Sequence, residues 1–402
     1  MRSIKHYLGF SDEKEILEER NRMYIDYVCA QTGWDREEAV HQMEGFRAQG
    51  VSYRYYVKKR LWAREGRKQE ISLRNIEKEK KGNRHSLSKH AKLTAAKTGW
   101  SARKAKECIL ESNLYTGCSP SDYWDYRFYE KTLEEQKQYL TKGVTELLIM
   151  KYNTDLEEIG MIRSKDKFAK KFGDLFGRIS FANRKITYEE FCEKTAGLTQ
   201  LIVKPVYGTH GSGVEKLDIP SDDREKRSFF EMLMEKPKSQ VEEVIVQHPD
   251  VAAFSPASVN TVRLVTIKDD SGIVHFMYAA LRMGTGGLID GISAGGIFAP
   301  VDVETGQVIR DGIKFNNETC EKHPVSGKKI KGFQVPNWES VLSAAKTGAE
   351  RLKGARLIGW DIAVTQEGAV LIEANSEANY KLAQLPYVAE GLGVRERFEP
   401  FL

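Results

Sequence analysis

The chain has 402 residues, of which 41% are hydrophobic and 30% charged, so it is long enough for two or three domains with a large core. It contains no run of 18 apolar residues, and its first residues lack the apolar segment of a signal peptide, so no transmembrane helix or secretion signal is expected. The five cysteines are scattered and lack metal-site spacing, which predicts reduced thiols in a cytoplasmic protein.

Positive charge is concentrated toward the N-terminus. The net charge is +5, but residues 54–107 carry 18 Lys or Arg against 5 Asp or Glu, a local excess of +13. A solvated helical surface would explain this excess. An acidic partner, such as an anionic glycan, a lipid headgroup or a membrane surface, would explain it as well. Nucleic acid is a weaker alternative, because no nucleic-acid-binding motif accompanies the charge.

Residues 1–142 predict a helical domain with a weak internal duplication. Ala-Gln-Thr-Gly-Trp-Asp at 30–35 recurs as Ala-Lys-Thr-Gly-Trp-Ser at 96–101, 66 residues later. Thr-Gly-Trp before a polar residue predicts a helix break, an anchoring tryptophan and an N-cap. We expect residues 78–84 to be a charged link between the copies. Each copy leads to an aromatic cluster that we expect to be core: Tyr53, Tyr55, Tyr56 and Trp62, then Tyr123, Trp124, Tyr126, Phe128 and Tyr129.

From residue 143 the pattern changes to an α+β arrangement with mostly antiparallel sheet. Strands are expected at 201–207, 214–219, 241–247, 261–268, 273–282 and 307–309, and a helix at 337–352. Residues 291–298 are rich in glycine, which predicts a flexible loop that could cover a substrate.

A glycine-rich hairpin follows the first of these strands, with the sequence Gly208-Thr209-His210-Gly211-Ser212-Gly213. Glycine lets backbone N–H groups approach phosphate oxygens, although a plain turn is also possible. The segment is neither a Walker A loop nor a Rossmann fingerprint. Lys204 precedes it within an apolar strand, and a buried lysine needs an anionic partner. Asp166 and Lys167 stand at a predicted helix start, where they either address phosphate or are simply solvated.

Further polar residues stand at the ends of later strands. The strand expected at 241–247 ends at Gln247, and His248 and Asp250 follow it. This arrangement could pair backbone groups with an adenine edge and Asp250 with ribose hydroxyls. Arg263 projects from an apolar strand, and Arg282 ends the next one. Such arginines often clamp phosphate or carboxylate, and surface salt bridges are the alternative.

Two strands near the C-terminus carry the strongest chemical signal. Leu357 to Val364 and Val370 to Asn375 flank Gln366-Glu367-Gly368, a predicted three-residue hairpin loop. In this register Asp361 lies opposite Glu373, and Asn375 shares the face of Glu373. Buried carboxylates repel each other, and Mg²⁺ held by a few oxygens plus nucleotide phosphates would remove that repulsion. The alternative is a hairpin with two solvated acids.

Taken in order along the chain, these motifs resemble the ATP-grasp superfamily over residues 145–395. The matching segments are Asp166-Lys167, Lys204-Pro205, 208–213, 243–248, 260–263 and Asp361 with Glu373-Ala374-Asn375. The branch that fits best is the sugar-transfer-associated ATP-grasp proteins, which are similar to D-alanine–D-alanine ligases and glutamate ligases. The resemblance implies an ATP-grasp fold after the helical domain, with an ATP-binding lid at about 160–250 and a metal and substrate subdomain at 251–402.

The resemblance also implies roles for the candidate residues. Lys167 and Lys204 would contact ATP phosphates, and the loop 208–213 would close over them. Gln247 and His248 would line the adenine, although Gln247 stands where many relatives carry an acidic residue. Asp361, Glu373 and Asn375 would bind two Mg²⁺ ions, while Arg282 and Arg263 would stabilise the transferring group.

The implied reaction is an ADP-forming ligation of a carboxylate to an amine through an acyl phosphate. The substrates would be small molecules, possibly sugar-linked or carrier-bound. A kinase on the same fold that phosphorylates a sugar or alcohol is the alternative, because it needs the same nucleotide site. A non-catalytic binding module that uses the basic segment is a third hypothesis, and it predicts no ATP binding.

Overall fold

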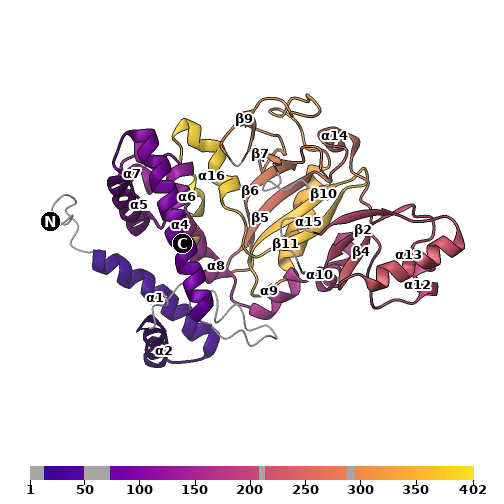
Figure 1. Ribbon diagram of the computed structural model, residues 1–402, viewed down its shortest axis with the longest axis horizontal. Coiled ribbons are helices and arrows are strands. Elements are labelled where there is room, and N and C mark those ends of the chain that lie inside the picture. The colour runs from indigo at the N-terminus through magenta and orange to yellow at the C-terminus, as the bar shows by residue number, and fades with distance from the viewer. Residues whose placement is uncertain (1–12, 49–72, 208–212, 288–294, 315) are drawn as a thin grey trace. The chain divides into compact units, whose positions relative to one another are not determined.

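The computed structural model describes residues 13–48, 73–207, 213–287, 295–314 and 316–402. The chain divides into two compact units, residues 1–156 with 387–402 and residues 157–386 (Figure 1). The expected boundary between residues 142 and 143 lies inside the first unit, and the division into domains stays a prediction. Within the described ranges, no helix combines the length and apolar character that a membrane span requires.

The first unit is helical. Its elements are α1 (Glu13–Thr32), α2 (Arg36–Ala48), α4 (Leu73–Thr98), α5 (Ala102–Thr116), α6 (Pro120–Asp125), η3 (Phe128–Glu130), α7 (Leu133–Gln136), α8 (Lys142–Tyr152) and η6 (Arg395–Phe401). The expected link at residues 78–84 was wrong, because these residues lie inside α4. Lysine and glutamate are good helix formers, and together they outweigh the single Gly82.

The duplicated Thr-Gly-Trp motif forms the same corner in both copies. The hydroxyls of Thr32 and Thr98 donate to the carbonyl four residues back, at 2.7 and 2.8 Å, and accept from the N–H two residues on, at 3.2 and 3.3 Å. Gly33 and Gly99 have φ of 72° and 74°, a conformation that favours glycine. Two residues after the glycine, the side chain of Asp35 or Ser101 accepts a backbone N–H of the following helix. The motif is therefore a helix stop joined to a helix start.

A third corner of this kind joins α5 to α6, and the sequence analysis missed it. Thr116 donates to Ser112 O at 2.7 Å, and Gly117 has φ of 69°. Cys118 takes the place of tryptophan, but the Thr-Gly pair and the Ser119 that matches Ser101 are shared with the other corners, as is the hydrogen bond from the third residue's N–H to the threonine hydroxyl, at 3.2 Å. In the second aromatic cluster, Tyr123, Tyr126 and Phe128 are core as expected, whereas Trp124 and Tyr129 are only partly buried. The first cluster, at residues 53–62, lies outside the described residues.

The second unit contains a four-stranded antiparallel sheet in the order β1-β4-β2-β3. Its strands are β1 (Ser180–Ala182), β2 (Gln200–Pro205), β3 (Glu215–Asp218) and β4 (Ser239–Glu243). Helices α12 (Tyr188–Lys194) and α13 (Asp223–Glu235) cover one face with an apolar core that includes Phe191, Leu201, Val203 and Val241. Because side chains alternate along a strand, Lys204 and Glu242 lie on the opposite face.

A seven-stranded antiparallel sheet forms the rest of the second unit, in the order β11-β10-β5-β6-β7-β8-β9 (Figure 1). The strands are β5 (Thr261–Lys268), β6 (Val274–Met283), β7 (Ile297–Val301), β8 (Gly312–Ile313), β9 (Thr319–Cys320), β10 (Leu357–Val364) and β11 (Ala369–Asn375). Helix α15 (Trp338–Glu350) packs on β5, β10 and β11, and Gly348 lies against the ring of the buried Trp360. Asp361, the next residue, therefore faces away from α15.

Short helices connect these elements: α9 (Leu156–Arg163), α10 (Lys165–Lys171), α11 (Gly173–Phe176), α14 (Pro249–Ala252), α16 (Lys381–Gln384) and η5 (Leu385–Glu390). Three expectations need correction. The strand expected at 241–247 ends at Glu243, and residues 307–308 make only isolated bridges. The loop expected at 291–298 extends too far, because Ile297 and Phe298 are buried in β7; residues 288–294 lie outside the described residues.

The C-terminal hairpin places Asp361 opposite Glu373, as predicted, but by a different route. Val364 pairs with Ala369, so the connection has four residues, Thr365 to Gly368, and not three. A β-bulge between Asp361 and Ile362 on this pair shifts the register by one residue. The longer loop and the bulge compensate, and the two carboxylates meet on one face.

Candidate active site

Asp361 is the centre of the candidate site. The carboxylate is buried and accepts hydrogen bonds from two arginines on neighbouring strands. Arg263 stands directly opposite on β5, with Nε 2.5 Å from Oδ1 and Nη2 2.9 Å from Oδ2. Arg282, from β6, places Nη1 2.9 Å from Oδ2. Burial alone would raise the pKa of Asp361, but the two guanidinium groups outweigh it and hold this pKa well below its usual range.

Glu373 and Asn375 complete the acidic face. Asn375 Nδ2 lies 3.4 Å from Glu373 Oε1, and Glu373 shares a hydrogen bond with Asp361. Burial, and then the negative charge of Asp361, raise the pKa of Glu373 above its ordinary value. Two carboxyl groups that push each other's pKa apart are typical of a site that takes up a cation or a proton.

The donor chemistry of this face fits Mg²⁺. Two carboxylates and an amide oxygen are hard ligands, and Mg²⁺ usually takes only one or two carboxylates and completes its coordination with water and phosphate. In the described part of the chain, no group of three or more His, Cys, Asp or Glu side chains could hold a metal unaided. A cation here would therefore depend on Asn375 and on oxygens from a nucleotide.

Lys204 projects from β2 and is part of a buried ionic network. Its Nζ lies 2.5 Å from Glu242 Oε1, while Arg178 places Nη2 2.7 Å from Glu242 Oε2. Arg178 Nη1 also donates to Leu371 O on β11 at 2.9 Å, so it links the small sheet to the large one. Burial would raise the pKa of Glu242, but Lys204 and Arg178 outweigh it and lower this pKa. The predicted anionic partner of Lys204 is thus present within the protein.

Helix α10 contains Lys167, the other candidate lysine, and also Lys165. Lys165 opens the helix, and its N–H donates to Val206 O, just after β2, at 3.3 Å. Burial lowers the pKa of Lys165, Glu373 raises it and Lys204 lowers it, which places Lys165 beside the acidic face. Lys167, the residue predicted from sequence, is exposed. Asp166, in the first turn of the helix, accepts the Lys167 N–H at 3.0 Å.

The glycine-rich segment joins β2 to β3, which pair antiparallel as expected for a hairpin. Gly208, Thr209, His210, Gly211 and Ser212 lie outside the described residues, so their proposed phosphate contacts stay a prediction. Gly213 has φ of 74°, and a Cβ there would lie 3.0 Å from the Pro205 ring. Glycine is therefore needed where the hairpin returns to the sheet.

The segment after β4 connects the small sheet to the large one. His248 N donates to Val364 O at the end of β10, at 2.7 Å. The Gln247 amide donates to Ser258 O and accepts from Asn260 N, both at 2.7 Å, so it holds two loops together. Asp250 is exposed, and its N–H donates to His248 Nδ1 at 3.3 Å. The adenine contacts expected here stay a prediction.

Sequence reasoning missed the side chains that hold the candidate site in place. Arg178 and Lys165 were not singled out, and Glu242 was treated only as part of a hinge strand. A buried charge is visible in the sequence only where apolar residues flank it, as they do Lys204. Arg178 lies in an irregular stretch between α11 and β1, where no period marks its side chain as buried.

A family model and several solved structures are similar to parts of this chain. The family model described as sugar-transfer associated ATP-grasp matches residues 171–400. The ATP-grasp ligase PsnB, complexed with a phosphomimetic variant of its minimal precursor, Mg and ADP, is similar at 15% identity and a TM-score of 0.33, over 65% of this chain and 64% of that one.

Two further solved structures are similar at the same level. One is the purK N5-carboxyaminoimidazole ribonucleotide synthetase in its ADP complex, at 13% identity and a TM-score of 0.34, over 63% of this chain and 51% of that one. The other is the D-alanine–D-alanine ligase from Bacillus anthracis complexed with ATP. Its sequence identity is 13% and its TM-score 0.32, over 60% of this chain and 63% of that one. This chain thus spans less than two thirds of each. Among the curated proteins, nothing matches significantly.

The part of the chain with the two antiparallel sheets has the ATP-grasp fold. The family match covers more than half of the chain, and the chain belongs to the sugar-transfer associated ATP-grasp family.

Proposed function

We propose that this protein is an ADP-forming carboxylate–amine ligase that works through an acyl phosphate. The observation that carries the proposal is the face on which Asp361, bound by Arg263 and Arg282, stands opposite Glu373. Phosphoryl transfer needs little covalent chemistry from the protein; it needs positioned charge of both signs in a sheltered place. These groups and Lys204 offer such an arrangement.

Each group has a proposed role. Asp361, Glu373 and Asn375 would hold Mg²⁺, as two ions in our proposal, and the metal would supply positive charge that offsets the charge of the ATP phosphates. Lys204 would neutralise a phosphate, and Lys165 is better placed than Lys167 for a second contact because it lies beside Glu373. The loop 208–213 would close over the phosphates, while Gln247, His248 and Asp250 would border the nucleoside.

The two arginines have the most specific proposed role. Arg263 and Arg282 are both anchored on Asp361, so their remaining N–H groups are oriented by a buried carboxylate. Such pre-oriented donors stabilise a negative charge that develops during the reaction. We propose that they bind the γ-phosphoryl group as it passes to the substrate carboxylate, after which the amine attacks the acyl phosphate and releases phosphate.

The test is an ADP-release screen over amino acids and uronic acids, each with and without an amine, followed by mass spectrometry of the product. A ligase releases phosphate only when acid and amine are both present and forms an amide. A phosphorylated product would instead support a kinase on the same fold. The screen should be run on Glu373→Gln, for which we expect at least a 100-fold loss of turnover. Glu367→Gln, in the exposed hairpin turn, is the matched control. Full activity of Glu373→Gln would refute the assignment of the metal face.

A further inference from the structure

The two copies of the duplicated helical segment have the same internal architecture. At an offset of 66 residues, four buried positions of α1 and α2 coincide with buried positions of α4 and α5. Ile25 and Val28 correspond to Ala91 and Thr94, and all four are buried. Ala39 and Met43 correspond to Ala105 and Ile109, and each is fully buried. The fold of this segment therefore depends on small and apolar residues at fixed positions, and its surface charge can vary.

The surface charge of the two copies is opposite. Asp26, Glu37 and Glu38 are exposed in the first copy, and their equivalents are the exposed residues Lys92, Arg103 and Lys104. Between residues 81 and 106 the second copy has eight Lys or Arg and no Asp or Glu. All eight are exposed: Lys81, Arg84, Lys89, Lys92, Lys97, Arg103, Lys104 and Lys106. Because the first copy folds into the same corner without this charge, the fold does not require it.

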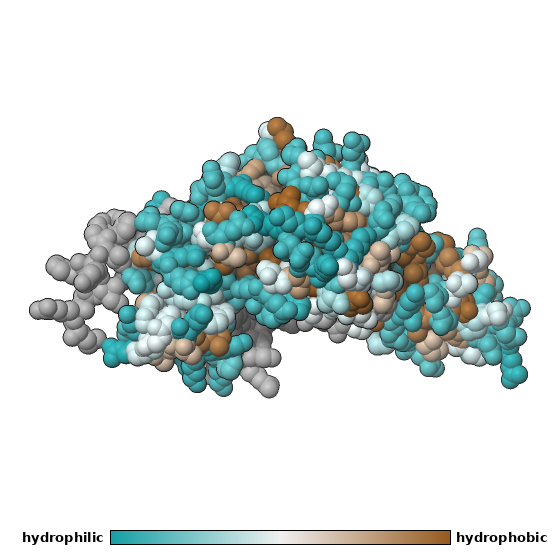
Figure 2. Space-filling view, turned by 90° about the horizontal axis from the view of Figure 1, so that it is seen from above, coloured by the Kyte–Doolittle hydropathy of each residue, from teal (hydrophilic) through white to brown (hydrophobic). Residues whose placement is uncertain are grey.

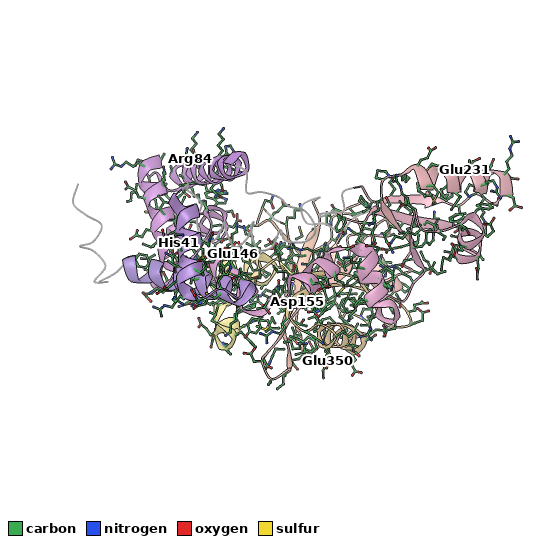
Figure 3. All side chains as sticks on the ribbon, turned by 90° about the horizontal axis from the view of Figure 1, so that it is seen from below. His41, Arg84, Glu146, Asp155, Glu231 and Glu350 are labelled. Atoms are coloured by element: carbon green, nitrogen blue, oxygen red, sulfur yellow. The ribbon has the colours of Figure 1, made fainter. Side chains whose placement is uncertain are left out.

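These basic side chains lie on outward faces of the helices. Lys81, His85, Lys89, Leu93 and Lys97 follow each other at four-residue spacing and form one strip along α4, about 24 Å long. Figure 3 shows Arg84 on the outer side of α4. In the described part of the second copy, the only ion pair of these groups joins Arg103 to Glu107, at 3.0 Å. The positive charge of this strip is therefore largely uncompensated by the residues described.

The strip also exposes apolar side chains. In the first copy, Tyr27 is buried and its hydroxyl donates to Asn153 O, next to α8. Its equivalent, Leu93, is 37% exposed between Lys89 and Lys97, and Leu110 on α5 is 49% exposed beyond Lys106. On the face of the helical unit displayed in Figure 2, hydrophilic residues predominate around isolated hydrophobic ones. The position that packs inside the protein in one copy thus faces outward in the other.

We propose that this basic helical copy docks on the surface of a membrane that contains anionic phospholipid. Clusters of four to eight Lys or Arg on a helical surface attract anionic headgroups, and interspersed leucines can enter the interfacial region. Most of the cations are lysines, which act as point charges and suit diffuse attraction better than paired recognition. Trp100 is half-buried with Lys104 Nζ 4.7 Å from its ring centre, so it offers no open stacking platform for nucleic-acid bases. The inference does not rest on the proposed enzymatic function.

The duplication supplies the test variant. Lys92→Asp, Arg103→Glu and Lys104→Glu together give the second copy the residues that the first copy carries at the same positions, so the helical corner is expected to fold. The control is Lys329→Glu, Lys331→Glu and Lys346→Glu, which makes the same charge change at exposed positions of the second unit. Circular dichroism should confirm that both variants are folded.

The measurement is co-sedimentation of the full chain with vesicles of phosphatidylcholine, with and without about one-third phosphatidylglycerol. One cationic side chain near an anionic surface strengthens binding by about fivefold, so loss of three cations should weaken binding by about 100-fold, and the three acids that replace them should weaken it further. We expect the wild type and the control to bind the anionic vesicles only, less at high salt, and the triple variant to lose binding.

Several results would overturn the proposal. They are the absence of wild-type binding to anionic vesicles, equal binding to neutral vesicles, and a folded triple variant that binds like the control. Binding of the wild type to RNA or to an anionic polysaccharide, without binding to vesicles, would assign the surface to a different partner. ADP release in solution is measured separately, so failure of the membrane proposal leaves the enzymatic proposal unaffected.

Discussion

Replacing Glu242 by glutamine should destabilise the four-stranded sheet. The Glu242 carboxylate is the counter-charge for two buried cations, Arg178 and Lys204. The side chains of Glu242, Arg178 and Lys204 are 4%, 4% and 9% exposed. Glutamine keeps the shape and one acceptor oxygen but removes the negative charge. Removing one partner of a buried ion pair typically costs about 3–5 kcal/mol. We take the lower end, about 3 kcal/mol, because the amide oxygen can still accept one hydrogen bond.

The assay is amide hydrogen exchange by mass spectrometry on peptides from β2 and β4. The chain has two compact units, so a local measurement is more informative than one global unfolding midpoint. A loss of about 3 kcal/mol corresponds to roughly 100-fold faster exchange where the sheet opens as a unit. Peptides from α4 and α5 in the other unit should not change.

Glu243→Gln is the matched control for this experiment. Glu243 is the adjacent residue, only partly buried, and its carboxylate accepts one backbone N–H, from Ile179, at 3.2 Å. We expect Glu243→Gln to change the rate of amide exchange in the β2 and β4 peptides by less than tenfold. A further test is Glu242→Gln combined with Lys204→Met, which removes one of the stranded cations and should recover part of the protection. If Glu242→Gln exchanged like the wild type, the view that this network holds the small sheet would be refuted.

Three other predictions concern stability. Glu158 accepts the N–H groups of Lys353, Gly354 and Ala355 at 2.7–2.9 Å, so Glu158→Ala should cost about 2 kcal/mol by thermal denaturation, with Glu367→Ala in the exposed hairpin turn as a neutral control. Because the pKa of Glu242 is lowered in the folded protein, its charge stabilises the fold above the ordinary glutamate pKa, and this stabilisation is lost below about pH 4. In an acid titration, the free energy of unfolding should therefore fall more steeply for the wild type than for Glu242→Gln. In Gly348→Ala, the new Cβ would lie 2.8 Å from the buried Trp360 ring; this clash should outweigh a helix-propensity gain of about 1 kcal/mol, and an unchanged melting temperature would contradict it.

The sequence alone indicated which charged side chains share a face in the candidate site. Strand periodicity and one glycine turn were enough to place Asp361 opposite Glu373, with Asn375 on the same face, because side chains alternate with a period of two. The same alternation brought out Lys204, Arg263 and Arg282, each a charged residue among apolar neighbours. The ordered motifs were sufficient to indicate the ATP-grasp family, since they combine residue types with their order along the chain.

Only the tertiary structure decided which charges meet. The bulge between Asp361 and Ile362 and the four-residue turn compensate each other, and no local pattern reveals such a pair of changes. Lys165 lies beside the acidic face while the neighbouring Lys167 is exposed, because the start of α10 is bound to the end of β2. Arg178 binds Glu242 and also donates to Leu371 O on β11, which is 193 residues away in sequence. A contact at that separation depends on how the two sheets pack. Local propensity acts over a few residues, whereas burial and ion pairing are determined by the folded whole.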